Sequence, residues 1–428
     1  MTEEHYLQKI IENPKDIWAN TALGNIYFIE KDYPKAVEYF ENVMDLDTWN
    51  EYANEKLGES YEKVIGYYLE YLKDNTDDAD AYFKLAVAYG SMDYEDEAIT
   101  TYKKVIELRP KEVTSYLRIG EQYAFFTRKE YKKALEYYEK AKAIDPTYVQ
   151  TYIHISEVYL SQKQNDKAIE VFKKSIEIDS TFGNGYSTIG QTYFIYIKDY
   201  EKAIPYFLKG IEFNQTKMSE EYLYYDLGRS YYTLGKYELA VPHLLKALEI
   251  NPKHSWSFLN NYSLGYSYKK LQQFIHAIFY LENAQEINPE DKDVYTELGY
   301  TYNELGELDE SVRNYLLAIE KNPENDLAYH NIGEVFLKKG LFDKGLEYLL
   351  KGKEVNSRYH KNFFINIGAA YLLNGDDRAK EWFTKSKALY NNDKRFFKTM
   401  NDDYHALKME ERGISKKQFS QLIEALKK

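Results

Sequence analysis

The chain of 428 residues contains no cysteine. Disulfide bonds and metal sites built from thiolate ligands are therefore excluded. No stretch of apolar residues approaches the length that a membrane-spanning helix needs. The amino-terminal residues 1–16 carry acidic side chains and lack the apolar core of a secretory signal peptide. We therefore expect a cytoplasmic protein that does not insert into membranes.

Positively charged residues are fewer than negatively charged ones. The chain has 56 lysine and arginine residues against 69 aspartate and glutamate residues, which gives a formal net charge of -13. A protein that binds nucleic acid needs a basic face, so this balance predicts that nucleic acid is not a partner. The abundance of lysine, asparagine, isoleucine and tyrosine is typical of an AT-rich genome and favours a bacterial source.

Sequence patterns of catalysis are missing as well. The glycine-rich stretch Gly183–Gly185 lacks the lysine of a phosphate-binding loop and follows no predicted strand, and no nucleophile elbow occurs. The eight histidines are scattered, with none at the spacing of metal ligands on one helix. The sequence therefore predicts a protein that is not an enzyme and that uses no cofactor and no metal.

The chain does contain one unit that recurs along its length. Gly265, Gly299 and Gly333 are 34 residues apart, and an aromatic residue follows each of them three positions later. A fixed period of this length is typical of small units that bury their apolar faces by stacking. In the unit Lys292–Asn325, apolar residues recur at helical spacing before and after Gly306. This pattern predicts two helices separated by a left-handed glycine cap.

The unit resembles the tetratricopeptide repeat, a helix-turn-helix of 34 residues. Its order of aromatic, Leu-Gly, Tyr, Ala and Pro positions is matched in one repeat by Tyr224, Leu227, Gly228, Tyr231, Ala240, Ala247 and Pro252. The resemblance covers residues 1–392 and implies an all-α, right-handed superhelical solenoid of about eleven repeats. We expect a half-repeat or cap helix in residues 1–16, the repeat array in residues 17–392 and capping helices in residues 393–428.

Three repeats depart from the period. The segment Glu51–Asp78 is about six residues short and lacks a turn glycine, so its two helices are expected to meet tightly or to fuse. Two extra residues lie near Thr127–Glu130 and one lies near Ile197–Asp199. Insertions in such arrays usually fall in loops, and we expect the same here.

Basic residues recur at one position of four successive first helices, namely Lys56, Lys84, Arg118 and His154. In the tetratricopeptide repeat family the first helices line the concave face, so the resemblance implies a basic row that faces an acidic ligand. The alternative is that three of these residues pair with a glutamate three residues later in the same helix. Those glutamates are Glu59, Glu121 and Glu157.

The same face of later repeats carries aromatic side chains. Tyr225 and Arg229 are four residues apart on one first helix, and Tyr262 and Tyr266 repeat that spacing on the next. Tyr300 extends the row. These positions differ from the core aromatic positions of the repeat, and groups of Tyr and Arg are typical of binding hot spots. We therefore expect them to contact a peptide.

Asparagine side chains form a third group on this face. Asn331 and Asn366 occupy equivalent positions in two repeats, and Asn362 lies close to the second. The resemblance implies that an asparagine at this position binds a peptide backbone through its side-chain amide.

The function that these patterns favour is a protein-interaction scaffold or adaptor that binds a peptide or helix in the concave groove. Two alternatives stay open. One is a peptide-sensing regulator that works through a separate effector protein. The other is a substrate-recruiting arm of a larger enzyme complex. The sequence does not predict an oligomeric state.

Overall fold

The computed structural model describes residues 2–47, 49–124, 128–213, 220–253, 256–355, 360–390 and 393–427, with the backbone alone for residues 360–362. Every regular element in these ranges is a helix, which confirms the predicted all-α repeat fold. The chain divides into two compact parts, Met1–Thr192 and Tyr193–Lys428. We call them the N-terminal and C-terminal modules and describe each by itself.

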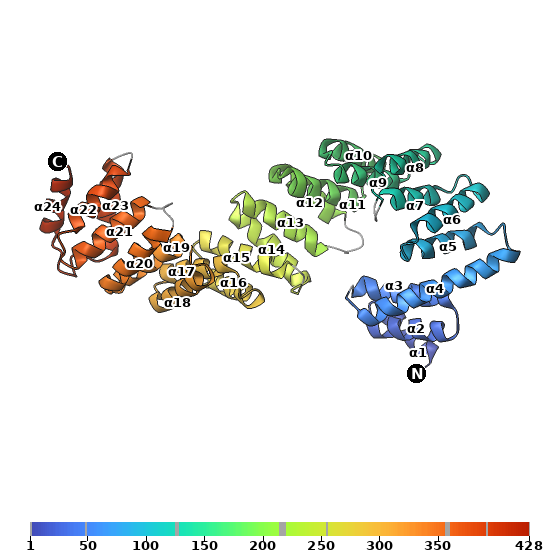
Figure 1. Ribbon diagram of the computed structural model, residues 1–428, viewed down its shortest axis with the longest axis horizontal. Coiled ribbons are helices and arrows are strands. Elements are labelled where there is room, and N and C mark those ends of the chain that lie inside the picture. Colours follow the sequence, from blue (N-terminus) through green and yellow to red (C-terminus); the bar gives the residue numbers. More distant parts are fainter. Residues whose placement is uncertain are drawn as a thin grey trace. The chain divides into compact units, whose positions relative to one another are not determined.

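The N-terminal module contains α1 to α11, which follow one another side by side in chain order (Figure 1). Their bounds are α1 Glu3–Glu12, α2 Ile17–Ile29, α3 Tyr33–Leu46, α4 Glu51–Asp74, α5 Ala79–Ser91, α6 Glu95–Leu108, α7 Val113–Ala124, α8 Tyr131–Ile144, α9 Val149–Ser161, α10 Asn165–Ile178 and α11 Gly183–Gln191. Helices α2 and α3, α5 and α6, α7 and α8, and α9 and α10 pack as pairs. The first helices α7 and α9 also pack against the second helix of the pair before them, whereas α5 packs against α4.

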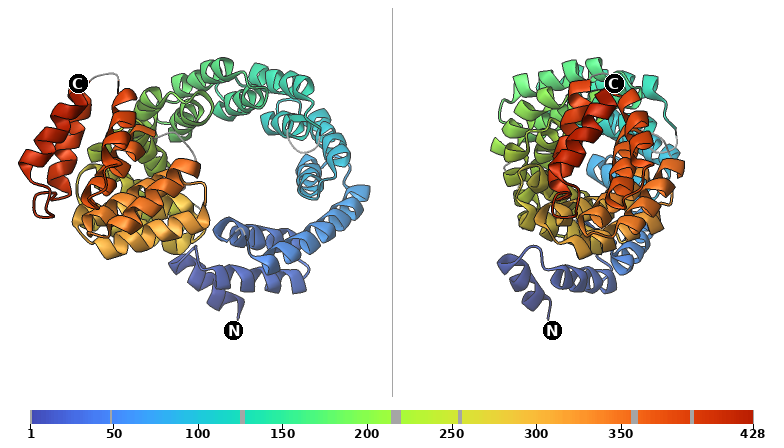
Figure 2. Two further views of the ribbon diagram at one scale, coloured as in Figure 1. Left: turned by 60° about the vertical axis from the view of Figure 1, so that its left-hand side comes forward. Right: turned by 90° about the vertical axis from the view of Figure 1, so that its left-hand side faces the viewer.

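The C-terminal module begins at Tyr193 within the π-helical segment η1, Thr192–Ile197, and its helices repeat the same pairing (Figure 2). Its helices are α12 Tyr200–Glu212, α13 Glu220–Thr233, α14 Tyr237–Ile250, α15 Ser257–Lys270, α16 Phe274–Ile287, α17 Lys292–Leu305, α18 Leu308–Lys321, α19 Asp326–Lys338, α20 Phe342–Val355, α21 His360–Leu373, α22 Ala379–Ala388, α23 Asp393–Ala406 and α24 Lys416–Lys427. The odd-numbered helices α13 to α21 are the first helices of their repeats. We call the surface that they form the first-helix face.

The pair α17 and α18 shows how the repeat sequence produces the fold. The carboxylate of Asp291 accepts hydrogen bonds from the backbone N–H groups that begin α17, and Gly306 ends the helix with a φ of 91°. The glycine cap predicted at Gly306 is thus confirmed. A Cβ atom on Gly299 would lie 2.7 Å from the ring of Tyr315, so only glycine allows the two helices to approach this closely. The Ser311 hydroxyl uses that approach to donate a hydrogen bond to the Gly299 carbonyl at 2.7 Å.

The short repeat Glu51–Asp78 has become a single helix. Residues Glu51–Asp74 form α4, 24 residues long and without a turn (Figure 1). Fusion was one of the two outcomes expected from the missing turn residues. Because one helix replaces a pair, α3 and α5 both pack against α4. Val37 of α3 and Leu85 of α5 lie against the same buried cluster, which includes Val64 and Tyr68 of α4.

The extra residue near Ile197–Asp199 does not lie in a loop, so that expectation is wrong. After α11 the chain continues as the π-helical segment η1 and turns at Lys198, whose φ is 61°. A π turn spans one residue more than an α turn, so the insertion is absorbed within the helical backbone. In the other insertion, Thr127 lies outside the described residues.

The C-terminal helices cover the end of the repeat stack. Phe396 and Tyr404 of α23 and Phe419 of α24 are buried in one cluster with Phe383 of α22. The loop between α23 and α24 reaches further back, because the Arg412 guanidinium donates hydrogen bonds to the last carbonyls of α19. The Leu337 carbonyl also accepts from the Gly340 backbone N–H, so Arg412 adds a side-chain donor to the end of this helix.

Candidate interaction surfaces

Three of the four basic residues in the N-terminal module are paired within the protein. Lys56 lies 2.7 Å from Glu59 and Arg118 lies 2.9 Å from Glu121, each on the same helix. The two ring nitrogens of His154 lie 3.3 Å from Glu157 and 3.1 Å from Glu121. These contacts correspond to the pairing that the sequence left open as the alternative to an acidic ligand. Whether the row also meets a ligand stays a prediction.

Lys84 departs from this pattern. It is exposed and makes no ion pair among the residues that the structure describes. The reason is visible in the sequence, since Val87 stands three residues later where the other three repeats carry glutamate. Valine in place of glutamate at position 87 removes a carboxylate and adds apolar surface beside the Lys84 ammonium group.

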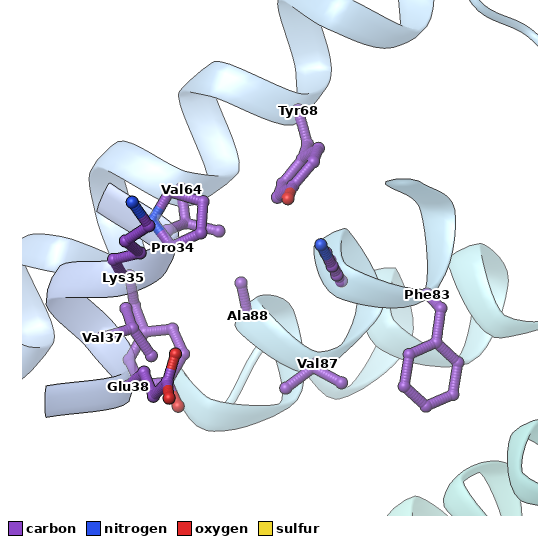
Figure 3. Close-up of a pocket in the computed structure, with 11 residues that line it drawn as sticks. Pro34, Lys35, Val37, Glu38, Val64, Tyr68, Phe83, Val87 and Ala88 are labelled. Carbon is purple, nitrogen blue, oxygen red and sulfur yellow. The ribbon is translucent and has the colours of Figure 1, made fainter. Parts of the chain in front are cut away.

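Lys84 and Val87 line a cavity of about 440 Å³ between α3, α4 and α5. Figure 3 shows Pro34, Val37 and Glu38 of α3 on one side and Phe83 and Val87 of α5 on the other. The remaining lining residues are Lys35, Tyr61, Val64, Tyr68, Lys84 and Ala88. Apart from its lysines, Glu38 and tyrosine hydroxyls, the lining is apolar. The cavity lies at α4, where a single helix stands in for a pair.

Tyr68 supplies a polar group to this cavity. The residue is only 7% exposed, yet its hydroxyl makes no hydrogen bond among the described residues. Burial raises the pKa of Tyr68 to about 12, so the hydroxyl is neutral at physiological pH. It is therefore a neutral hydrogen-bonding group on an apolar wall. The cavity was not predicted from the sequence, in which neither Tyr68 nor Val87 was among the expected site residues.

In the C-terminal module, Tyr225 is a core residue, and the expectation that it lies outside the core is wrong. It is 6% exposed and is buried with Leu244 and Leu264 from the two following helices. Its ring stacks on Trp256 with centroids 5.2 Å apart. Burial raises the pKa of its hydroxyl. The site that seemed free for a ligand is filled by the start of the next repeat.

Tyr262 is the equivalent residue one repeat later and is also largely a packing residue. Its half-buried ring packs against the cluster that contains Leu281 of α16 and Leu298 of α17. Burial raises the pKa of its hydroxyl. Tyr262 is not one of the buried core residues, but its ring packs against them and is only partly accessible.

The remaining predicted residues of this group come together with cations. Arg229 lies over the rings of Tyr225 and Tyr232, at 5.8 and 5.5 Å from their centroids. The Lys269 ammonium lies 4.3 Å from the centroid of Tyr266 and 4.9 Å from that of Tyr300. These contacts run over three consecutive first helices, α13, α15 and α17. We call Arg229, Tyr232, Tyr266, Lys269 and Tyr300 the cation–ring row.

Sequence analysis missed Tyr232 and Lys269. They occupy equivalent positions three residues after Arg229 and Tyr266, so their helical spacing was a usable signal. Lys269 also pairs with Glu297 of the next first helix. By contrast, the Nε of Arg229 is buried and makes no hydrogen bond within the described part of the chain.

The two asparagines predicted to bind a peptide backbone both contact the ring of His330. The side-chain Nδ2 of Asn366 lies 3.0 Å from Nε2 of His330, and the Nδ1 of that ring lies 3.2 Å from the side-chain Oδ1 of Asn331. A neutral His330 protonated at Nδ1 satisfies both contacts, because Nε2 then accepts from Asn366. Asn366 is only 3% exposed, whereas Asn331 is half-buried. The side chain of Asn362 lies outside the described residues.

A buried carboxyl group lies near the end of this face. One carboxyl oxygen of Asp403 on α23 is buried and has no hydrogen-bond partner in the described ranges. Burial, with smaller contributions from Glu334 of α19 and from Asp402, raises the pKa of Asp403 to about 7.

Within the described ranges, no group of histidine and carboxylate side chains is arranged to hold a metal ion. The helices of the same ranges include none that is both long and apolar enough to cross a lipid bilayer.

Family models for the tetratricopeptide repeat match the chain in several places. One, described as tetratricopeptide repeat, matches residues 184–217 and 260–291, and a second of that description matches residues 222–254. A model described as TPR repeat matches residues 299–340, and one for the ARM repeat of tetratricopeptide repeat protein 21 matches residues 20–174. The chain is a tetratricopeptide repeat protein.

A curated relative is anaphase-promoting complex subunit 3 of Schizosaccharomyces pombe, which is 25% identical over 139 residues. This match covers 31% of the present chain and 21% of the relative, so the chain spans a small part of that protein's length.

Solved structures are also similar to this tetratricopeptide repeat protein. MamA is 25% identical, with 39% of this chain and 96% of MamA covered and a TM-score of 0.33. Yeast Tom70 is 16% identical, with 96% and 99% covered and a TM-score of 0.35. The C-terminal part of a repeat protein from Cytophaga hutchinsonii is 18% identical, with 64% and 98% covered and a TM-score of 0.44. With TM-scores this low, these likenesses carry no argument about function.

Membership of the family supports a role as a protein-interaction scaffold. The tetratricopeptide repeat is typically a non-catalytic fold that binds protein partners.

Proposed function

We propose that this tetratricopeptide repeat protein is a non-enzymatic scaffold that binds a partner peptide along the first-helix face of its C-terminal module. The observation that supports this most is the cation–ring row on α13, α15 and α17. A guanidinium held over a ring, as that of Arg229 is, keeps N–H groups available for a hydrogen-bond acceptor, while the ring offers flat apolar surface. The Lys269 ammonium differs, because it is already paired with Glu297. Arg and Tyr combined in this way dominate the binding energy of many interfaces. The cytoplasmic location and the bacterial source are part of the same proposal.

The peptide would be anchored by the residues that retain exposure. Tyr300 is 40% exposed, and Tyr266 and Arg229 are half-buried. Tyr225 and Tyr262 contribute by holding these side chains in place, since Tyr225 lies under Arg229 and Tyr262 stacks against Tyr266. A surface held by packed rings is already ordered before binding, which lowers the entropic cost of association.

The test is to capture partners with the full chain and to compare two exposed aromatic residues. Tyr300→Ala removes a ring of the cation–ring row, and Phe279→Ala removes a ring that is 56% exposed on α16, a second helix. We expect Tyr300→Ala to weaken binding of the captured partner by about 1–3 kcal/mol and Phe279→Ala to have no effect. Circular dichroism should show both variants folded.

The opposite result would overturn the proposal. If Phe279→Ala abolishes capture while Tyr300→Ala leaves it intact, the partner binds the second-helix face.

A further inference from the structure

The N-terminal module contains an apolar cavity that the repeat fold does not require. In a regular array, the two helices of a complete repeat separate the second helix of the repeat before it from the first helix of the repeat after it. Here α4 alone separates α3 from α5, and the space between the three helices amounts to about 440 Å³. Cavities of this size accommodate small ligands or several side chains of a partner.

The walls of this cavity carry opposite charges that form no ion pair among the described residues. On α5, the pKa of Asp80 is lowered mainly by Arg109 and to a smaller extent by Lys84. Lys84 on α5 and Glu38 on α3 are both exposed, and neither forms an ion pair among the described residues. Lys35, also on α3, is neutralised by Asp32 at 3.1 Å. The cavity thus has a positive rim on its α5 side and a free carboxylate on its α3 side.

Lys84 is free because of a change confined to this repeat. Lys56, Arg118 and His154 occupy the equivalent positions, and each contacts a glutamate three residues later. Val87 replaces that glutamate next to Lys84 and lines the cavity. One residue change therefore exposes a cation and extends the apolar wall at the same place.

The Tyr68 hydroxyl is a second, independent sign of a ligand. The side chain is more than nine-tenths buried, lines the cavity and has no hydrogen-bond partner among the described residues. The hydroxyl oxygen itself remains accessible from the cavity, so an acceptor on a ligand can bond to it in place of water.

We propose that the cavity between α3, α4 and α5 is a docking site for a partner peptide that inserts one bulky apolar side chain. An acidic residue on one side of that side chain pairs with Lys84, and a basic residue on the other side faces Glu38. The peptide backbone supplies the acceptor for Tyr68. A small molecule is a weaker fit, because the two charges are exposed on opposite walls and do not converge. The site rests on the scaffold role proposed above but shares no residue with the cation–ring row.

The probe is a panel of short synthetic peptides, acetylated and amidated, with Trp, Leu or Ala at the centre. Glu and Lys flank the centre in either order, and a control series carries Ser at both flanks. Binding to the full chain is measured by fluorescence polarisation up to about 1 mM peptide. We expect peptides centred on Trp or Leu, with both charges, to bind at least about tenfold more tightly than those centred on Ala.

Three variants of the chain assign the binding to the cavity. Val87→Glu recreates the ion pair of the other repeats and should lower affinity by about tenfold. Lys84→Glu should reverse the preference for flanking charge. Lys103→Glu is the matched control, because Lys103 is an exposed lysine on α6 that makes no ion pair among the described residues and does not line the cavity. It changes net charge equally and should leave binding unchanged.

Several outcomes would overturn the proposal. They are no binding by any charged peptide, equal binding of Trp-centred and Ala-centred peptides, or equal effects of Lys84→Glu and Lys103→Glu. The variant Tyr300→Ala separates this site from the first-helix face of the C-terminal module. If Tyr300→Ala abolishes peptide binding and Val87→Glu does not, the cavity is not the site but the scaffold role stands.

Discussion

The two modules treat the cations of their first helices differently. In the N-terminal module, Lys56 and Arg118 lie against carboxylates. In the C-terminal module, Arg229 lies over the rings of Tyr225 and Tyr232, and Lys269 combines its ring contacts with an ion pair to Glu297. A carboxylate neutralises a cation, whereas a ring only stabilises it and leaves its donors free. At Arg229 the C-terminal face is therefore better suited to recruit an acceptor from a partner.

The two modules also differ in how deeply these residues are built into the core. The ion pairs of the N-terminal module are partly exposed on the helix surface. In the C-terminal module, Tyr225 is buried and Tyr262 packs between repeats. Substitutions on the two faces should consequently have very different effects on stability.

The largest effect is expected for Tyr225→Ala. Removing a buried ring that stacks on Trp256 leaves a cavity, which should cost about 3–5 kcal/mol of local stability. Hydrogen exchange of α13 to α15 measures this as a lower free energy of opening. Tyr300→Ala is the control, since that ring is 40% exposed and its loss should change stability by no more than about 0.5 kcal/mol. Equal exchange in the two variants would show that Tyr225 is not a core residue.

The burial of Tyr225 could not be predicted from the sequence. The period identified Tyr224 and Tyr231 as repeat positions, and Tyr225 fell outside the pattern. Its burial depends on Trp256, which precedes α15 at an irregular link between repeats. The repeat period does not account for Trp256. A contact between a regular position and an irregular link is visible only in three dimensions.

Other features could be predicted because they depend on local chemistry. The glycine cap at Gly306 and the fusion of Glu51–Asp74 into α4 follow from residues present or missing at one turn. The exception at Lys84 was equally local, since comparing Val87 with Glu59, Glu121 and Glu157 needs only the sequence. The cavity beside it was not predictable, because it depends on how α3 and α5 pack around α4.

A smaller effect is expected from the carboxyl group of Asp403. Its pKa is raised to about 7 in the folded chain from an ordinary value of 3.8. The folded state therefore binds the proton more tightly than the unfolded state does. The stabilisation is fully present below about pH 4 and is lost as the pH rises through about 7. This is the reverse of what a carboxylate paired with a cation would show.

The pH dependence can be measured by hydrogen exchange of α23 and α24, with the rates corrected for intrinsic pH effects. We expect these helices to lose on the order of 1–3 kcal/mol of stability between pH 5 and pH 8. This interval lies above the ordinary pKa of 3.8 and includes the raised pKa of about 7. Asp403→Asn should remove this dependence, whereas Asp402→Asn, at a neighbouring exposed position, should retain it. A dependence that survives Asp403→Asn would assign it to another group.

The smallest effect is expected in the paired row of the N-terminal module. Arg118→Ala breaks the contact with Glu121, but Glu121 remains 3.1 Å from His154 and is not left without a partner. Ion pairs at partly exposed sites contribute little, so the loss should be about 0.5 kcal/mol or less, measured by hydrogen exchange of α7 and α9. In about 1 M salt, where charges are screened beyond about 3 Å, the difference between Arg118→Ala and the native chain should shrink further. A cost of several kcal/mol that persists at high salt would mean that Arg118 acts as a packing residue, and the contrast between the two modules would then be wrong.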